Sequence, residues 1–152
     1  MKKTFLNRFV QICIVLGMLA GAALIVLLIV KYPAAAETLG LAGVPKIRSA
    51  IAASVAAVCV LGGEYIAFEL LCMMRTLERD PFVQGNVRSL RRMGAAALIV
   101  AALGTAATLM LHPLRYAAFA ALPVAMCGLF SLVLSGVFEQ AVAYKQENDL
   151  TI

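Results

Sequence analysis

Four long apolar segments constrain this chain more than any other feature of its sequence. They cover residues 9–30, 49–74, 93–111 and 117–138, and an α-helix needs roughly 20 apolar residues to cross a bilayer. The chain is 63% hydrophobic, with a mean hydropathy of +0.96, whereas soluble domains are about 45–50% apolar. A folded core of 152 residues cannot bury so much apolar surface. We therefore predict an all-α membrane protein that lipid surrounds.

The first apolar segment has one alternative interpretation, a cleaved signal peptide. The basic start "MKKTFLNR" fits such a peptide. However, residues 9–30 exceed the ~7–15 apolar residues of a signal sequence. We therefore expect this segment to be retained as a membrane span.

The distribution of Lys and Arg predicts the orientation, because basic residues are retained on the cytoplasmic side. With both termini cytoplasmic, nine basic residues lie inside and four outside, which together make the thirteen of the chain. The nine are Lys2, Lys3, Arg8, Arg75, Arg79, Arg88, Arg91, Arg92 and Lys145, and the four are Lys31, Lys46, Arg48 and Arg115. We therefore predict a single membrane domain over residues 1–152, an antiparallel four-helix transmembrane bundle. It has a cytoplasmic loop at 75–92 and a cytoplasmic tail at 139–152.

Small residues at a spacing of four indicate where helices approach closely. Gly17 and Gly21 form such a pair in the first span, and Ser131 and Ser135 form one in the fourth. Such pairs occur at helix interfaces in membranes. The alternative is that small residues are simply common in these spans.

The residues that usually carry chemistry are sparse. The four cysteines, Cys13, Cys59, Cys72 and Cys127, stand singly, so no CxxC motif or zinc-ligand spacing occurs. The sole histidine, His112, is in no catalytic set with serine and aspartate. We therefore expect no catalytic residue, no metal site and no cofactor, and a protein that is not an enzyme.

Two carboxylates lie inside the second span, Glu64 and Glu69. If Arg75 marks the headgroup level, Glu64 lies roughly 16 Å deeper and Glu69 roughly 9 Å deeper, at 1.5 Å per residue. Glu64 is then either a proton or cation site or a protonated group that fixes helix packing, with Ser131 as its expected partner. Glu69 is shallow enough to reach the surface or meet an arginine of the loop.

The charged loop "RTLERDPFVQGNVRSLRRMG" separates the second and third spans. Pro81 disfavours a helical conformation at the residue before it. Asn86 is expected to cap a helix that runs into the third span. Val87, Leu90 and Met93 would share one side of that helix, with basic residues on the others, as in a helix at a membrane surface. Topology and contact with anionic lipid at the cytoplasmic face would suffice to explain Arg88, Arg91 and Arg92.

The loop and the C-terminal segment together resemble the domain-of-unknown-function 2975 family of small bacterial membrane proteins. The resembling loop residues are Pro81, Phe82, Asn86, Val87, Leu90, Arg91, Arg92 and Gly94, and the C-terminal ones are Val137, Phe138, Glu139 and residues 147–152. The resemblance implies four spans in a bacterial cytoplasmic membrane and no known enzymatic activity. It also implies an association with small helix-turn-helix regulators.

Two functional hypotheses of different class follow. In the first, the protein is a membrane-bound interaction protein that controls a small cytoplasmic DNA-binding regulator without binding DNA itself. Its candidate contact residues are Phe82, Asn86, Arg88, Arg91, Arg92, Glu147, Asp149, Leu150 and Ile152. In the second, Glu64 belongs to a small transporter or channel component that acts as a homo-oligomer. Lipid sensing through the loop is a variant that the residues do not separate from the first.

Overall fold

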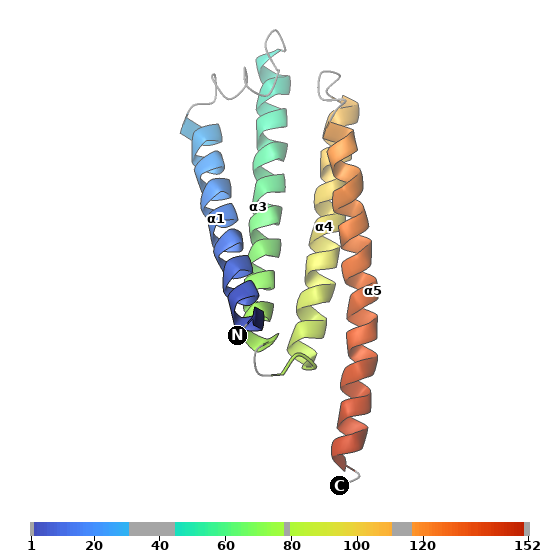
Figure 1. Cartoon of the computed structure of the whole chain (residues 1–152). Coiled ribbons are helices and arrows are strands. Elements are labelled where there is room, and N and C mark those ends of the chain that lie inside the picture. Colours follow the sequence, from blue (N-terminus) through green and yellow to red (C-terminus); the bar gives the residue numbers. More distant parts are fainter. Residues whose placement is uncertain (1, 31–44, 78–79, 111–116, 151–152) are drawn as a thin grey trace.

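Four long helices make up the computed structural model, which describes residues 2–30, 45–77, 80–110 and 117–150 (Figure 1). They are α1 (Lys2–Val30), α3 (Lys46–Leu77), α4 (Gln84–Met110) and α5 (Ala117–Leu150). The shortest, α4, has 27 residues, or roughly 40 Å at 1.5 Å per residue, against a bilayer core of about 30 Å. All four are apolar enough to span a membrane. The prediction of an all-α membrane protein with four spanning helices is confirmed.

The helices extend furthest beyond the predicted spans at one end of the molecule. There α3 continues to Leu77, α4 already begins at Gln84, and α5 runs on to Leu150. The charged loop predicted over 75–92 is therefore largely helical. Polar residues in these stretches do not interrupt the helices, because their backbone hydrogen bonds are made within each helix and their side chains can face water.

Each helix packs mainly on its neighbour in the chain. The main contacts join α1 to α3, α3 to α4, and α4 to α5, so α1 and α5 lie at opposite ends of an antiparallel row (Figure 1). The start of α1 and the end of α5 lie at the same end of the molecule as the α3–α4 turn. We call this the loop end, and we call the opposite end, where α4 leads into α5, the far end.

The protein core follows one side of α4, the helix between α3 and α5. Val87, Leu90, Met93, Ala97 and Ala101 are all buried and recur every three or four residues, which is the period of one helix face. The sequence predicted that the first three of these would rest on the membrane surface. They are instead covered by protein, because α4 continues through them without a break between its two neighbours.

Two glycines set the distance between α4 and α5. A Cβ atom at Gly94 would lie 2.9 Å from the carbonyl oxygen of Gly128, and one at Gly128 would lie 3.0 Å from that of Gly94. Both distances are shorter than an ordinary van der Waals contact, so the two backbones can approach only where neither residue has a side chain. This close approach gives the α4–α5 pair its tight packing.

The predicted small-residue pairs are only partly at interfaces. Gly21 in α1 lies against α3, where an added Cβ would overlap Oε1 of Glu64, whereas Gly17 has no such neighbour within 4 Å. In α5, Ser131 donates a hydrogen bond to the Leu90 carbonyl of α4 (2.8 Å). Ser135 is buried, and its hydroxyl bonds to the carbonyl of Leu132 in its own helix.

Candidate functional site

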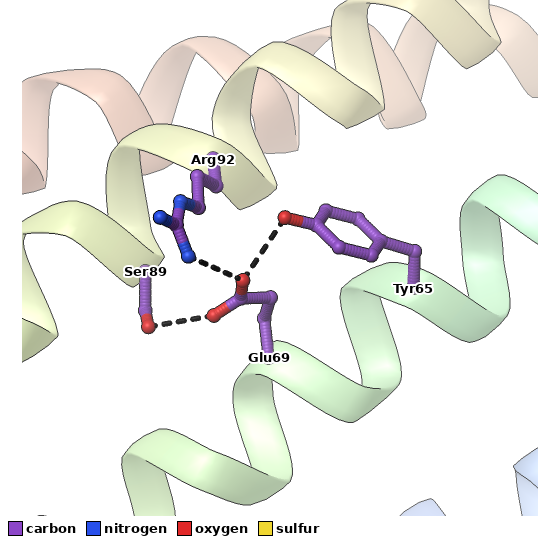
Figure 2. Close-up of polar contacts among 4 residues, drawn as sticks. All are labelled: Tyr65, Glu69, Ser89 and Arg92. Carbon is purple, nitrogen blue, oxygen red and sulfur yellow. Dashed lines mark hydrogen bonds and ion pairs between the residues drawn. The ribbon is translucent and has the colours of Figure 1, made fainter.

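A buried carboxylate joins α3 to α4 near the loop end. Figure 2 shows Glu69 of α3 surrounded by Tyr65 of the same helix and by Ser89 and Arg92 of α4. The Ser89 hydroxyl donates to Glu69 Oε2 (2.7 Å), while the Tyr65 hydroxyl (2.9 Å) and Arg92 Nη1 (3.4 Å) both donate to Oε1. The Glu69 side chain is only 9% exposed, and that of Arg92 is 62% exposed.

The bonds to Glu69 show what this cluster does. A buried charge is tolerated only when it is paired and hydrogen-bonded, and this carboxylate has three donors. Two of the three come from α4, so the cluster holds the start of α4 against α3. The expectation that Glu69 reaches an arginine of the loop agrees with this geometry. Because Arg92 is paired with Glu69, its charge is not free to bind another protein.

Asn86 holds the α3–α4 turn closed from inside. Its side chain donates from Nδ2 to the carbonyl of Pro81 (2.8 Å), and its Oδ1 accepts from the Thr76 hydroxyl of α3 (2.6 Å). An amide group is suited to this position because it offers a donor and an acceptor at once. Asn86 is 2% exposed, and a residue so buried is not available to contact a partner.

The sequence prediction that Asn86 caps the helix is wrong. The helix begins at Gln84, two residues earlier, and the Asn86 N–H already donates to the carbonyl of Val83 (3.0 Å). The asparagine side chain turns back to the Pro81 carbonyl and the Thr76 hydroxyl instead of capping the first turn. The pattern of an asparagine before a helical stretch does not distinguish these two roles.

The turn is also attached to α5. Asp80 forms an ion pair with Lys145, and its Oδ1 accepts the N–H of Phe82 (3.1 Å). The bond from Lys145, followed by the one from the Phe82 backbone, holds the pKa of Asp80 below its ordinary value. The ring of Phe82 contacts that of Phe138 in α5, with 5.7 Å between centroids and 43° between planes. The turn therefore lies against α5 through one polar and one aromatic contact.

Arg91 is the second loop arginine with an internal partner. Its Nη2 lies 3.1 Å from Oε2 of Glu139 in α5, and both side chains are more than half exposed. Exposed pairs of this kind contribute little stability, typically about 0–1 kcal/mol. The pair still directs the Arg91 side chain toward α5.

The predicted contact residues thus divide into four groups. Phe82, Arg91 and Arg92 are partly accessible but engaged within the protein, and Asn86 is buried. Arg88 is exposed and has no ion-pair or hydrogen-bond partner among the described residues, and Glu147 is exposed on the last part of α5. The side chains of Asp149 and Leu150, and all of Ile152, lie outside the described residues.

Glu64 occupies a separate place, in a groove between α1 and α3. The groove has a volume of about 450 Å³ and is lined mainly by apolar side chains, together with Gly17 and Gly63. The carboxylate of Glu64 lies against Gly21, where a Cβ atom would overlap it, and it has no hydrogen-bond partner among the described residues. The small size of Gly21 is therefore what makes room for this acid.

The structure does not bring Glu64 and Ser131 together, contrary to the sequence prediction. Ser131 lies on α5, which packs on α4, and it bonds to the Leu90 carbonyl of that helix. Glu64 lies on α3 and meets α1. Equal depth in the membrane suggested the pairing, but depth says nothing about which helices are neighbours.

Two contacts at the loop end were not foreseen from the sequence, those of Asp80 and of Glu139. Both residues bring an acid to a basic partner on another helix. Asp80 directly precedes the resembling loop residues, and Glu139 is itself one of the resembling C-terminal residues, which is the signal that the sequence offered. Their separations from the partners, 65 and 48 residues along the chain, hide the pairing.

A comparison with protein families gives one result. The family model described as "Protein of unknown function (DUF2975)" matches residues 8–152, nearly the whole chain. The resemblance that the loop and the C-terminal segment suggested is confirmed. No curated protein and no solved structure matches the chain.

Proposed function

This chain belongs to the DUF2975 family, and we propose that it is a non-enzymatic membrane protein that docks a cytoplasmic regulatory protein at its loop end. The observation that carries the proposal is the braced extension of α5 at that end. α5 has 34 residues, or roughly 51 Å, against a bilayer core of about 30 Å. Figure 1 shows its last part continuing past the start of α4.

The contacts of this extension support a docking role. Lys145 pairs with Asp80, Glu139 pairs with Arg91, and Phe138 contacts Phe82. A surface that is already ordered before binding has less conformational entropy to lose when a partner arrives. Arg88 and Tyr144, the latter 68% exposed, remain on its outside. Arg88 and the α5 extension, with Tyr144 and Glu147, are therefore the proposed contact surface.

In this proposal the loop end faces the cytoplasm of a bacterial cell. The excess of Lys and Arg at this end supports that orientation. The proposed partner is a small helix-turn-helix DNA-binding regulator, the class that the family resemblance suggests. The protein would hold or release this regulator at the membrane and would not contact DNA itself.

Photo-crosslinking in native membranes tests the docking proposal. A benzoylphenylalanine would replace Arg88 or Tyr144 in the docking surface, and Ile47 or Phe119 as matched exposed controls at the far end. We expect one and the same small soluble protein to be attached at positions 88 and 144 and at neither control. In addition, Arg88→Glu should lower its capture several-fold, whereas Arg48→Glu should not.

Two outcomes would refute the docking proposal. One is that positions 88 and 144 attach only lipid or further copies of this chain. The other is that the same soluble proteins are attached equally at both ends of the molecule. Arg91 and Arg92 are poor test positions, because their charge reversal would break contacts within the protein.

Glu64 supports a second candidate function, a site for a proton or cation in a transporter. The supporting observation is its place in an open groove of about 450 Å³ without a hydrogen-bond partner among the described residues. Acids inside membrane spans commonly mark ion pathways. Purified protein in liposomes that contain a pH-sensitive dye would show proton flux that Glu64→Gln abolishes. Flux that survives Glu64→Gln, or is absent in the wild type, contradicts this candidate.

A further inference from the structure

A second groove between α1 and α3 lies nearer the loop end than Glu64. It has a volume of about 610 Å³ and is lined by Arg8, Gln11, Ile12, Val15, Leu16, Leu71 and Arg75. Its size lies within the range of about 300–1,000 Å³ that is usual for small-molecule sites. Arg8 lies close to the start of α1 and Arg75 close to the end of α3, so both basic groups are at the headgroup side of a wall that is otherwise apolar except for Gln11.

The two arginines of this groove differ from the other basic residues of the loop end. Arg91 and Arg92 each have a carboxylate partner within the protein. Arg8 and Arg75 are exposed and have no ion-pair or hydrogen-bond partner among the described residues. No carboxylate of a described residue lines the groove, and α1 contains no acidic residue. The positive charge is therefore balanced by nothing that the described part of the protein supplies.

From this charge and shape we propose that the groove binds one anionic phospholipid. The guanidinium groups of Arg8 and Arg75 would hold the phosphate, because this planar fork of donors matches phosphate oxygens well. The amide of Gln11 would add a further donor. Below the headgroup, an acyl chain would lie along Ile12, Val15, Leu16 and Leu71. A lipid fits this groove better than free phosphate does. A lipid would contact both the two arginines and the apolar side chains, whereas free phosphate would contact the arginines alone.

This inference is independent of the docking proposal. It uses α1 and the end of α3, whereas docking uses Arg88 and the extension of α5. A bound lipid would fill the space between α1 and α3, which contact each other less than the other two neighbouring helix pairs do. It would thereby fix the position of α1.

The test uses the purified full chain in detergent micelles, so that membrane topology plays no part. Native mass spectrometry would compare retention of phosphatidylglycerol with that of phosphatidylcholine with identical acyl chains. We expect the wild type to prefer phosphatidylglycerol, and Arg8→Gln/Arg75→Gln to reduce that preference on the order of tenfold. The matched control, Lys46→Gln/Arg48→Gln, removes the same charge from exposed positions at the far end, outside the groove, and should retain the preference.

A second measurement places the acyl chain. The chain contains no tryptophan, so Ile12→Trp introduces a single fluorophore into the groove, and Ile99→Trp introduces one on the exposed side of α4. Phosphatidylglycerol with brominated chains, as a minor component, should quench the tryptophan at position 12 more than brominated phosphatidylcholine does. At position 99 the two lipids should quench equally.

The proposal is overturned if the groove and control double variants lose the preference equally, or if the wild type shows none. It is overturned also if position 12 does not distinguish the two brominated lipids. Retention of inorganic phosphate without phosphatidylglycerol would likewise contradict a lipid site.

Discussion

Glu69 illustrates at the scale of single residues how a charge is kept inside a membrane helix. Its carboxylate is buried, yet each oxygen accepts at least one hydrogen bond, from Ser89, Tyr65 or Arg92. Removing a donor leaves part of a buried charge without compensation, which costs more than the bond itself contributed. The Ser89 bond is the shortest of the three, and it comes from the neighbouring helix.

We therefore predict that Ser89→Ala lowers the free energy of unfolding by about 1–3 kcal/mol, because it leaves Oε2 of Glu69 without its donor. The matched control is Ser54→Ala, since the exposed Ser54 hydroxyl bonds only to the Ala50 carbonyl of its own helix. This control should change the free energy by less than about 0.5 kcal/mol. Denaturant unfolding of the purified protein in mixed micelles measures the change in the free energy of unfolding for both substitutions. Equal effects of the two substitutions would contradict the role of Ser89.

Asp80 forms its ion pair with Lys145 outside the membrane-spanning part of the helices. Lys145 stabilises its charged form, so its pKa in the folded protein lies below the ordinary value of 3.8. The contact is therefore present above pH 3.8 and is lost as the pH falls through the lower, folded-state pKa.

We predict that a carboxyl NMR titration of the protein in micelles finds a pKa below 3.8 for Asp80. In Lys145→Gln the value should rise toward 3.8, because the largest cause of the shift is removed. A control substitution, Gln146→Ala, should leave the value where it is in the wild type. An Asp80 pKa that does not respond to Lys145→Gln would show that the two side chains are not paired in solution.

At the scale of elements, close packing is concentrated between α4 and α5. Gly94 and Gly128 oppose each other there, and a Cβ atom on either would lie closer to the other's carbonyl oxygen than an ordinary van der Waals contact allows. Glycine costs a helix roughly 1 kcal/mol relative to alanine. Its presence in the middle of both helices is explained by the approach of the two backbones, which a methyl group would prevent.

We expect Gly94→Ala to destabilise the protein by about 1–3 kcal/mol, the usual cost of overpacking. Gly104→Ala on the same helix is the control, because nothing lies within 4 Å of its added Cβ. That substitution should be neutral or stabilise by up to about 1 kcal/mol through helix propensity. Thermal unfolding in micelles compares the two. If the two substitutions shift the unfolding temperature in the same direction by similar amounts, close packing at Gly94 is not what its substitution disturbs.

The elements themselves were largely predictable from the sequence, although their ends were not. Apolar length located every spanning helix, because the bilayer sets that length. It did not reveal that α4 begins at Gln84 or that α5 continues to Leu150. A helix stops where its backbone or its tertiary contacts change, and the apolar pattern stops where the lipid does. These two positions differ by several residues at the loop end.

For the whole molecule, the important feature is an open row of helices with α1 and α5 at its two ends. Exposed large apolar side chains occur on all four helices, among them Phe9, Ile51, Ile99 and Phe130. In a membrane these side chains contact lipid, so the row needs no closed core. The polar contacts are gathered toward the loop end instead, on α3, α4 and α5.

The row predicts that positions 88 and 144 lie on one side of the membrane and position 47 on the other. Single cysteines at these positions, in a chain whose four free cysteines are replaced by alanine, would be labelled with a membrane-impermeant maleimide in intact cells. We expect labelling at position 47 only, with positions 88 and 144 reached after the membrane is opened. Labelling of position 88 in intact cells would show that the orientation is the opposite of the one proposed. Positions 88 and 144 should be labelled, or not labelled, together in both orientations.

The sequence by itself determined that this chain is an all-α membrane protein with four spans, because span length and composition are local properties that lipid selects directly. It also pointed to the loop and the C-terminal segment, since they alone combine charge with a family resemblance. Only the tertiary structure decided which arginines are engaged. Arg88, Arg91 and Arg92 look equivalent in the sequence, but the helix row brings Glu139 to Arg91 and Glu69 to Arg92 and leaves Arg88 exposed. These partners are 48 and 23 residues away along the chain, so their identity depends on which helices are neighbours, and no local pattern contains that information.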